Sequence, residues 1–244
     1  MSPPRARAAC TPQRLVVAGA GGALGRAVLE RALTSGRFAS VSVLTGAPLV
    51  AGVRGLRALP HDGSATTSVA ADIGVVVFDR GRDYFGRDEA YHLPEPAALP
   101  ALAARLRAGG VHTLIVVGAV APSLLPQALQ HGLASLDEHA VAALGFERLL
   151  IVRPAQEAPR GPPLRRAQRL ARWMLSQLHY LVPTHEQPVR AESVADFVFE
   201  VLRQWPAAAP GTRVAGPPLV WAAAQAEGPV PVVARWLGIA EAPR

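Results

Sequence analysis

The sequence contains no lysine, so all 25 residues counted as Lys or Arg are arginines. Without a side-chain ammonium group, the chain alone supplies no lysine for a Schiff base or for lowering the pKa of a neighbouring acid. Cysteine is nearly absent as well, because Cys10 is the single one. An internal disulfide and a cysteine-based metal site are therefore excluded.

Long hydrophobic runs are also missing. The longest, around residues 114–122, is much shorter than the roughly 20 residues that cross a bilayer. Residues 1–13, "MSPPRARAACTPQ", contain no apolar core of the kind that a signal peptide has. The sequence therefore predicts a soluble, cytoplasmic protein with no membrane partner.

Acidic residues are outnumbered, since 18 Asp and Glu against 25 Arg give a formal net charge of +7. The arginines are scattered, which favours a solvated surface that steers anionic ligands over a nucleic-acid interface. The best local support for nucleic-acid binding is residues 164–172, "LRRAQRLAR", but a helix there would pack its leucines on a sheet. We therefore do not expect a nucleic-acid partner.

Apolar runs typical of buried strands alternate along the chain with amphipathic helix patterns, which predicts βαβ units. Strands are expected at residues 15–18, 40–44, 53–59, 73–78, 112–118 and 148–152. Helices are expected at residues 22–35, from just before Pro100 through Leu106, and at about 129–144, 164–178, 191–204 and 232–237. The sequence thus predicts an α/β protein with a Rossmann-type, doubly wound parallel sheet.

The predicted elements divide the chain into three parts. Residues 1–13 are expected to form a disordered head, and residues 14–155 a dinucleotide-binding Rossmann core. Residues 156–244 are expected to form a small helical lobe over the carboxyl ends of the strands, packed on the core within one structural domain.

The stretch "LVVAGAGGALGRAV", residues 15–28, predicts a dinucleotide-binding turn. The strict fingerprint fails where Leu24 stands, but Gly19-x-x-Gly22-x-x-Gly25 fits the related short-chain dehydrogenase spacing. Glycines permit the tight turn and a close approach of the backbone to a diphosphate, and the first amides of the helix, at Ala23 and Leu24, face the anion. The alternative is a tight βα turn in some other α/β protein.

Two features of the sequence bear on whether the nucleotide is NAD or NADP. An NAD site usually carries an acid about 20 residues after the turn, but no acid occurs between Glu30 and Asp62. Arg26 is placed to meet a 2′-phosphate, which favours NADP over NAD, although an ordinary solvated helix residue is the alternative. Asp62 is expected either to face the adenine or to be a turn aspartate.

Three segments together resemble the atypical short-chain dehydrogenase/reductases. These are the glycine turn, "GFERLLIVRPA" (residues 145–155) and "QPVRAESVADFVFEVL" (residues 187–202). The resemblance is to an NAD(P)H-binding group that includes Tat-interacting oxidoreductase-like proteins and nucleoside-diphosphate-sugar epimerase-like relatives. It implies that Arg153 and Pro154 border the nicotinamide end and that Gly118 stands at the position of the family's serine. Phe78 and Asp79 follow the fourth strand and so are expected near the same end.

The family's Tyr-x-x-x-Lys pair has no counterpart here. Counting back from Glu138 places the lysine position near Ala134 and the tyrosine position near Gln130. His131 could act as an acid or base near neutral pH, but an exposed helix face is the alternative. The resemblance therefore implies a divergent oxidoreductase-family member with weak or no dehydrogenase activity.

A second hypothesis is a non-catalytic redox sensor, regulator or assembly partner that binds a dinucleotide, since fold does not fix function. A small-molecule substrate and a protein partner are both compatible with the sequence.

Overall fold

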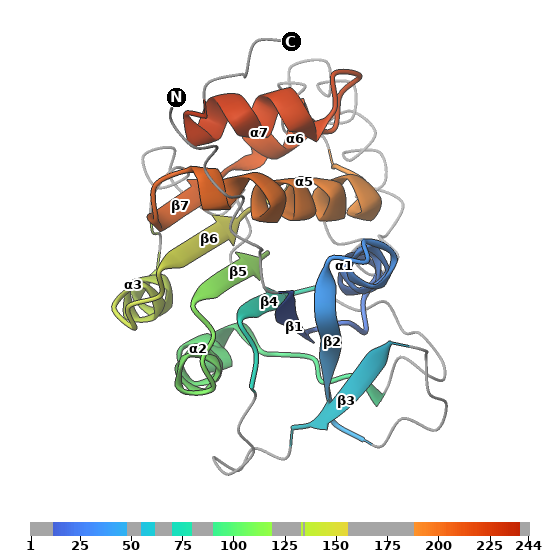
Figure 1. Ribbon diagram of the computed structural model, residues 1–244. Coiled ribbons are helices and arrows are strands. Elements are labelled where there is room, and N and C mark those ends of the chain that lie inside the picture. The colour runs from blue at the N-terminus through green and yellow to red at the C-terminus, as the bar shows by residue number, and fades with distance from the viewer. Residues whose placement is uncertain are drawn as a thin grey trace, which may run out of the picture.

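Seven parallel strands form a single sheet in the order β3-β2-β1-β4-β5-β6-β7 (Figure 1). The computed structural model describes residues 12–47, 55–61, 70–79, 90–118, 133, 135–155 and 188–239. The strands are β1 (Gln13–Ala18), β2 (Phe38–Thr45), β3 (Leu56–Pro60), β4 (Ile73–Val77), β5 (Thr113–Val117), β6 (Arg148–Val152) and β7 (Gly211–Ala215). This is the doubly wound dinucleotide-binding order with one strand added, so the prediction of a Rossmann-type α/β fold is confirmed.

Helices cover both faces of the sheet (Figure 1). One face is covered by α1 (Ala23–Thr34), α5 (Ala191–Gln204), α6 (Pro217–Ala223) and α7 (Pro229–Leu237). The other is covered by α2 (Leu99–Ala108), which a 3₁₀ turn η2 (Pro96–Ala98) precedes, and by α3 (Leu136–Ala142). Along β1, Leu15 and Val17 join the first core and Val16 and Ala18 join the second. Both faces of β1 are therefore buried, which explains why residues 15–18 form a continuous apolar run.

The C-terminal part of the chain completes the sheet. Strand β7 pairs in parallel with β6, from Gly211 opposite Arg148 to Ala215 opposite Val152. A 3₁₀ turn, η7 (Trp205–Ala207), leads from α5 toward β7 and buries Trp205. Neither β7 nor α6 is predicted from the sequence. The helix expected at 164–178 lies outside the described residues.

The predicted helix at about 129–144 is shorter where it is described. Residue 133 is not helical, and α3 begins at Leu136 after the N-cap Ser135. The Ser135 hydroxyl accepts a hydrogen bond from the backbone N–H of Glu138 (3.2 Å). A serine cap satisfies an otherwise unbonded donor in the first turn, which explains why the helix begins there.

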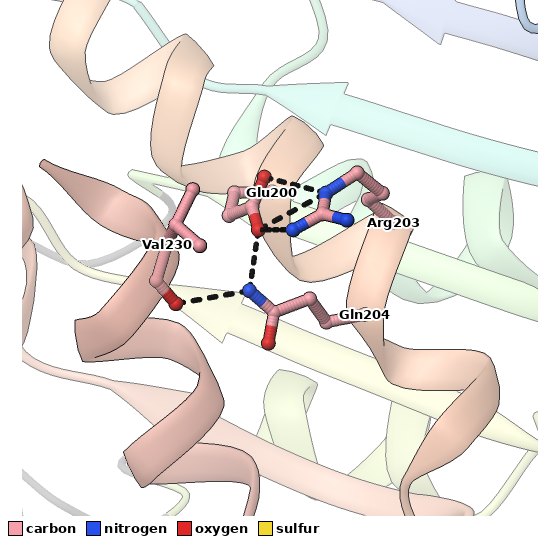
Figure 2. A network of polar contacts seen from close by, with 4 residues as sticks. All are labelled: Glu200, Arg203, Gln204 and Val230. Atoms are coloured by element: carbon pink, nitrogen blue, oxygen red, sulfur yellow. Dashed lines mark hydrogen bonds and ion pairs between the residues drawn. The ribbon is translucent and has the colours of Figure 1, made fainter. Parts of the chain in front are cut away.

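A polar network joins α5 to the first turn of α7 (Figure 2). The Gln204 side-chain amide donates to the carbonyl oxygen of Val230 (2.9 Å) and to the carboxylate of Glu200. The Arg203 guanidinium donates to both oxygens of the same carboxylate, at 2.9 and 3.1 Å from Nε. The network fixes the relative position of the two helices where Gln204 is buried.

The Glu200 carboxylate gives this network a pH dependence. Burial raises the pKa of Glu200, but hydrogen bonds from Arg203 and Gln204 and the charges of Arg203 and Arg37 outweigh burial, so its pKa lies below 4.5. A carboxyl group with a lower pKa in the folded state stabilises the fold above its unfolded pKa, and this contribution is lost as the pH falls through the folded value.

We expect Glu200→Gln to lower the free energy of unfolding by about 1 kcal/mol at neutral pH. The difference from the wild type should shrink as the pH falls below 4.5, the ordinary Glu value. Urea denaturation over a pH series measures it. Gln204→Met, which removes one of the donors, should weaken the same acid dependence. A difference between wild type and Glu200→Gln that stays constant through the acid range would contradict this prediction.

Candidate functional site

The candidate site lies at the carboxyl ends of β1 and β4, where the connections of the sheet diverge. From β1 the chain passes to α1 on one face, and the segment after β4 leads to α2 on the opposite face. In open α/β sheets, ligands bind in the crevice outside such a switch point. The glycine turn follows β1, and Phe78 and Asp79 follow β4, so two of the predicted segments meet here.

Close approaches of the backbone dictate the glycines of the turn. Gly19 has φ +88°, and a Cβ atom there would lie 2.0 Å from the carbonyl oxygen of Val77 on β4. A Cβ atom on Gly25 would lie 1.8 Å from the carbonyl oxygen of Gly19. Both positions therefore require glycine, and together they allow the first turn of α1 to pack closely against the end of β1.

Helix α1 begins at this turn without a side-chain cap of its own. Its N-cap is Gly22, whose carbonyl accepts the first helical bond, from Arg26 N–H (2.9 Å). The backbone N–H groups of Ala23, Leu24 and Gly25 precede that bond and have no partner within the helix. They form the part of the turn that suits an anion, because the positive end of the helix dipole lies there as well.

An internal carboxylate lies at this position. Oδ2 of Asp79 accepts a hydrogen bond from Leu24 N–H at 2.7 Å. A Cβ atom on Gly22 would lie 2.4 Å from the same oxygen, so the Asp79 side chain rests directly on the turn. The structure thus brings Gly22, Leu24 and Asp79 into mutual contact. All three are predicted from the sequence as cofactor residues, but the contact of Asp79 with the helix N-terminus is not.

Residues 90–94 run across the ends of β1 and β2. Gly19 N–H donates to the carbonyl oxygen of His92 (3.1 Å), and His92 N–H donates to the carbonyl oxygen of Leu44 (3.0 Å). Tyr91 forms an antiparallel bridge with Thr45 at the end of β2. This segment, which the sequence analysis does not connect with the site, therefore borders the glycine turn on the side of β2.

His92 also belongs to a cluster of basic side chains. Its ring centroid lies 3.8 Å from that of His61, whose Nδ1 lies 3.1 Å from Nη1 of Arg105. Burial, and then the charges of His61 and Arg105, lower the pKa of His92 to about 4. His92 is therefore neutral at neutral pH, and because an arginine only donates, His61 Nδ1 is an acceptor.

The residues predicted at the nicotinamide end lie along neighbouring strand ends. Phe78 is buried and its N–H donates to the carbonyl oxygen of Val117 (2.8 Å), while Gly118 N–H donates to that of Val152 (2.9 Å). Arg153 and Pro154 follow β6 and are buried. Ala23 and Arg26 are exposed on α1. Asp62, Gln130, His131 and Ala134 lie outside the described residues.

Arg153 has a fully buried ion-pair partner. Its Nη2 donates to Oε2 of Glu138 at 2.5 Å, and the two side chains are 0% and 1% exposed. Its backbone N–H donates to the carbonyl oxygen of Ala215 on β7 (2.8 Å). Arg153 thereby ties α3, which carries Glu138, to the ends of β6 and β7. From the sequence, Glu138 is expected on the helix that would have carried the catalytic pair, but its contact with Arg153 is not predicted.

The described residues were also compared with the requirements of a membrane-spanning helix and of a metal site. None of their helices combines the length and the apolar character needed to span a membrane. Nor do these ranges contain three His, Cys, Asp or Glu side chains grouped so that they could hold a metal ion.

No protein-family model matches this chain, and no curated protein matches it either. Among solved structures, it is similar to UDP-N-acetylglucosamine 4-epimerase from Bacillus cereus, with 15% identity, a TM-score of 0.48 and coverage of 83% of this chain and 75% of that one. It is also similar to a wide-type short-chain dehydrogenase/reductase from Veillonella parvula in complex with NADP. There the identity is 10%, the TM-score 0.48 and the coverage 84% and 95%.

A third similar structure is a Rossmann-fold NAD(P)-binding family protein from Shigella flexneri, with 15% identity, a TM-score of 0.47 and coverage of 80% and 88%. Likeness at this level does not assign an activity. The fold is instead established by the strand order of this chain.

Proposed function

We propose that this chain binds a nicotinamide dinucleotide, NADP in preference to NAD, with its diphosphate on the glycine turn between β1 and α1. The observation that carries the proposal is the pair of backbone approaches at Gly19 and Gly25. They leave no room for any other residue type and bring the N-terminus of α1 to the switch point of the sheet. Such a turn at such a place is what dinucleotide binding requires.

Different residues of the site would bind different parts of the cofactor. Leu24 N–H and its neighbours in the first turn of α1 would hold the diphosphate, once the Asp79 carboxylate has left Leu24. Arg26, exposed on the next turn, would meet a 2′-phosphate. Phe78, Gly118 and Pro154 would border the nicotinamide ring. A bound cofactor would supply hydride transfer at this place.

Classical proton transfer has no support in this chain. The family that it resembles uses a lysine ammonium to lower the pKa of a tyrosine, and the sequence contains no lysine. We therefore propose a divergent member with weak or no dehydrogenase activity. The Asp79–Leu24 contact favours a second candidate, a dinucleotide-responsive regulator, because this contact and a bound diphosphate exclude each other and so define two states of the turn.

Calorimetric titration with NADPH and with NADH tests the binding proposal. We expect Arg26→Ala to weaken NADPH binding by about tenfold, as expected for losing one charge-assisted contact, and to leave NADH binding unchanged. Arg31→Ala is the matched control, because Arg31 lies on the same helix and pairs with Asp196 instead (3.0 Å). Equal losses for both cofactors would overturn the role of Arg26.

Turnover separates the two candidate functions. Oxidation of NADPH in the presence of aldehydes, ketones and quinones would support the divergent enzyme. Binding without oxidation would support the regulator. Absence of binding to either cofactor, in the wild type and in the Asp79 variants described below, would overturn both.

A further inference from the structure

We propose that the Asp79 carboxylate is a built-in competitor for the diphosphate and sets the affinity of the dinucleotide site. This inference rests on the proposed function and adds a regulatory contact to it. A ligand that carries a diphosphate must displace the carboxylate from Leu24 N–H, whereas a ligand without a phosphate group need not.

The geometry places the carboxylate where an anion on the turn would bind. The 2.7 Å bond from Leu24 N–H is made by a donor of the first turn of α1, the group that a bound phosphate would use. Cβ, Cγ and Oδ2 of Asp79 lie 2.6, 2.5 and 2.4 Å from the position of a Cβ atom on Gly22. The side chain therefore fills the space that the glycine leaves open, so the turn cannot hold the carboxylate and a diphosphate together.

Charge adds to this steric competition. Two anions close together at one site repel each other, so Asp79 opposes a diphosphate even from a neighbouring position. The positive end of α1 favours one anion at a time on its first turn. Removing the charge of Asp79 should consequently strengthen binding, which is the opposite of what removal of a ligand-binding residue does.

The contact also supplies the cap that α1 lacks within its own turn. Gly22 offers no side-chain cap, and Asp79, in the segment after β4, supplies the acceptor that a serine or aspartate N-cap normally provides. The preceding residue, Phe78, is held by its hydrogen bond to Val117. Rotation about the Cα–Cβ bond of Asp79 would move Cγ and both carboxylate oxygens away from Leu24 N–H without moving this backbone.

Asp79→Asn and Asp79→Ala test the inference. Asparagine keeps an acceptor for Leu24 N–H and removes the charge, whereas alanine removes both. Titration with ADP and NADPH should show binding about a hundredfold tighter for Asp79→Ala, which releases the whole charge-assisted hydrogen bond, and about tenfold tighter for Asp79→Asn, which loses only the charge. Adenosine, which has no phosphate, should bind all forms equally. Asp137→Asn on α3 is the matched control for the change in net charge and should bind like the wild type.

The outcomes distinguish the inference from the proposed function. If the wild type and both variants bind NADPH with equal affinity, the competitor role is overturned and the proposed function stands. Weaker binding by Asp79→Asn and Asp79→Ala would make Asp79 a ligand-binding residue and would also overturn it. A gain seen with adenosine as well as with ADP would show that Asp79 acts on the nucleoside instead. Absence of NADPH binding in all forms would overturn both proposals.

Discussion

Replacing Arg153 by methionine is expected to lower the free energy of unfolding by about 3–5 kcal/mol, because the change removes the arginine that pairs with a buried carboxylate. The Arg153–Glu138 pair is almost completely removed from solvent, with side chains 0% and 1% exposed. In such surroundings little water is available to compensate the charge that remains. Urea denaturation at neutral pH measures the loss.

The double variant Arg153→Met, Glu138→Leu should recover most of this loss, since two apolar side chains replace two desolvated charges. The exposed pair between Arg31 and Asp196, 53% and 46% exposed, supplies the control, and Arg31→Met should cost less than about 1 kcal/mol. A double variant as unstable as the single one would contradict this account. It would show that packing at the ends of β6 and β7, rather than isolation of a charge, sets the cost.

The strands that the sequence predicts best are those buried on both faces. β4 is apolar throughout, and β5 and β6 are apolar after their first residues, Thr113 and Arg148, because their side chains meet a core on each side of the sheet. β7 reads "GTRVA" and buries only Ala215, so its residues carry little periodic signal. It is a strand because it pairs in parallel with β6. A tertiary contact of this kind cannot be predicted from a short segment of sequence.

The site divides in a similar way. The glycine turn follows from local steric demands and is therefore recognisable in the sequence. The contact of Asp79 with Leu24 joins residues 55 positions apart and depends on β4 lying beside β1. One signal does point to it: an acid stands directly after a strand that this fold places next to the turn. The pairing of Arg153 with Glu138 and the ring contact between His61 and His92 have no such signal, because they depend on how α3 and residues 90–94 pack.

Gly25→Ala is expected to destabilise the protein and to remove dinucleotide binding. Two effects of opposite sign compete at this position. Alanine is favoured over glycine within a helix by about 1 kcal/mol, but its Cβ atom would lie 1.8 Å from the carbonyl oxygen of Gly19 and 2.8 Å from Cα of Ala20. Both are backbone atoms, so no side-chain rotation relieves the overlap, and α1 must move away from β1. Overpacking costs typically about 1–3 kcal/mol, so we expect a net loss despite the propensity gain.

The same displacement moves the first-turn N–H groups of α1 away from the position that a diphosphate requires. NADPH affinity should fall about a hundredfold or more, as expected when two donors to a charged group are lost together. Gly46→Ala is the control, since a Cβ atom there has no heavy atom within 4 Å and its φ is not positive. If Gly25→Ala bound NADPH like the wild type, the close packing of α1 on β1 would not be what positions the ligand. Dinucleotide binding at this turn would then lose its structural basis, whatever the stability of the variant.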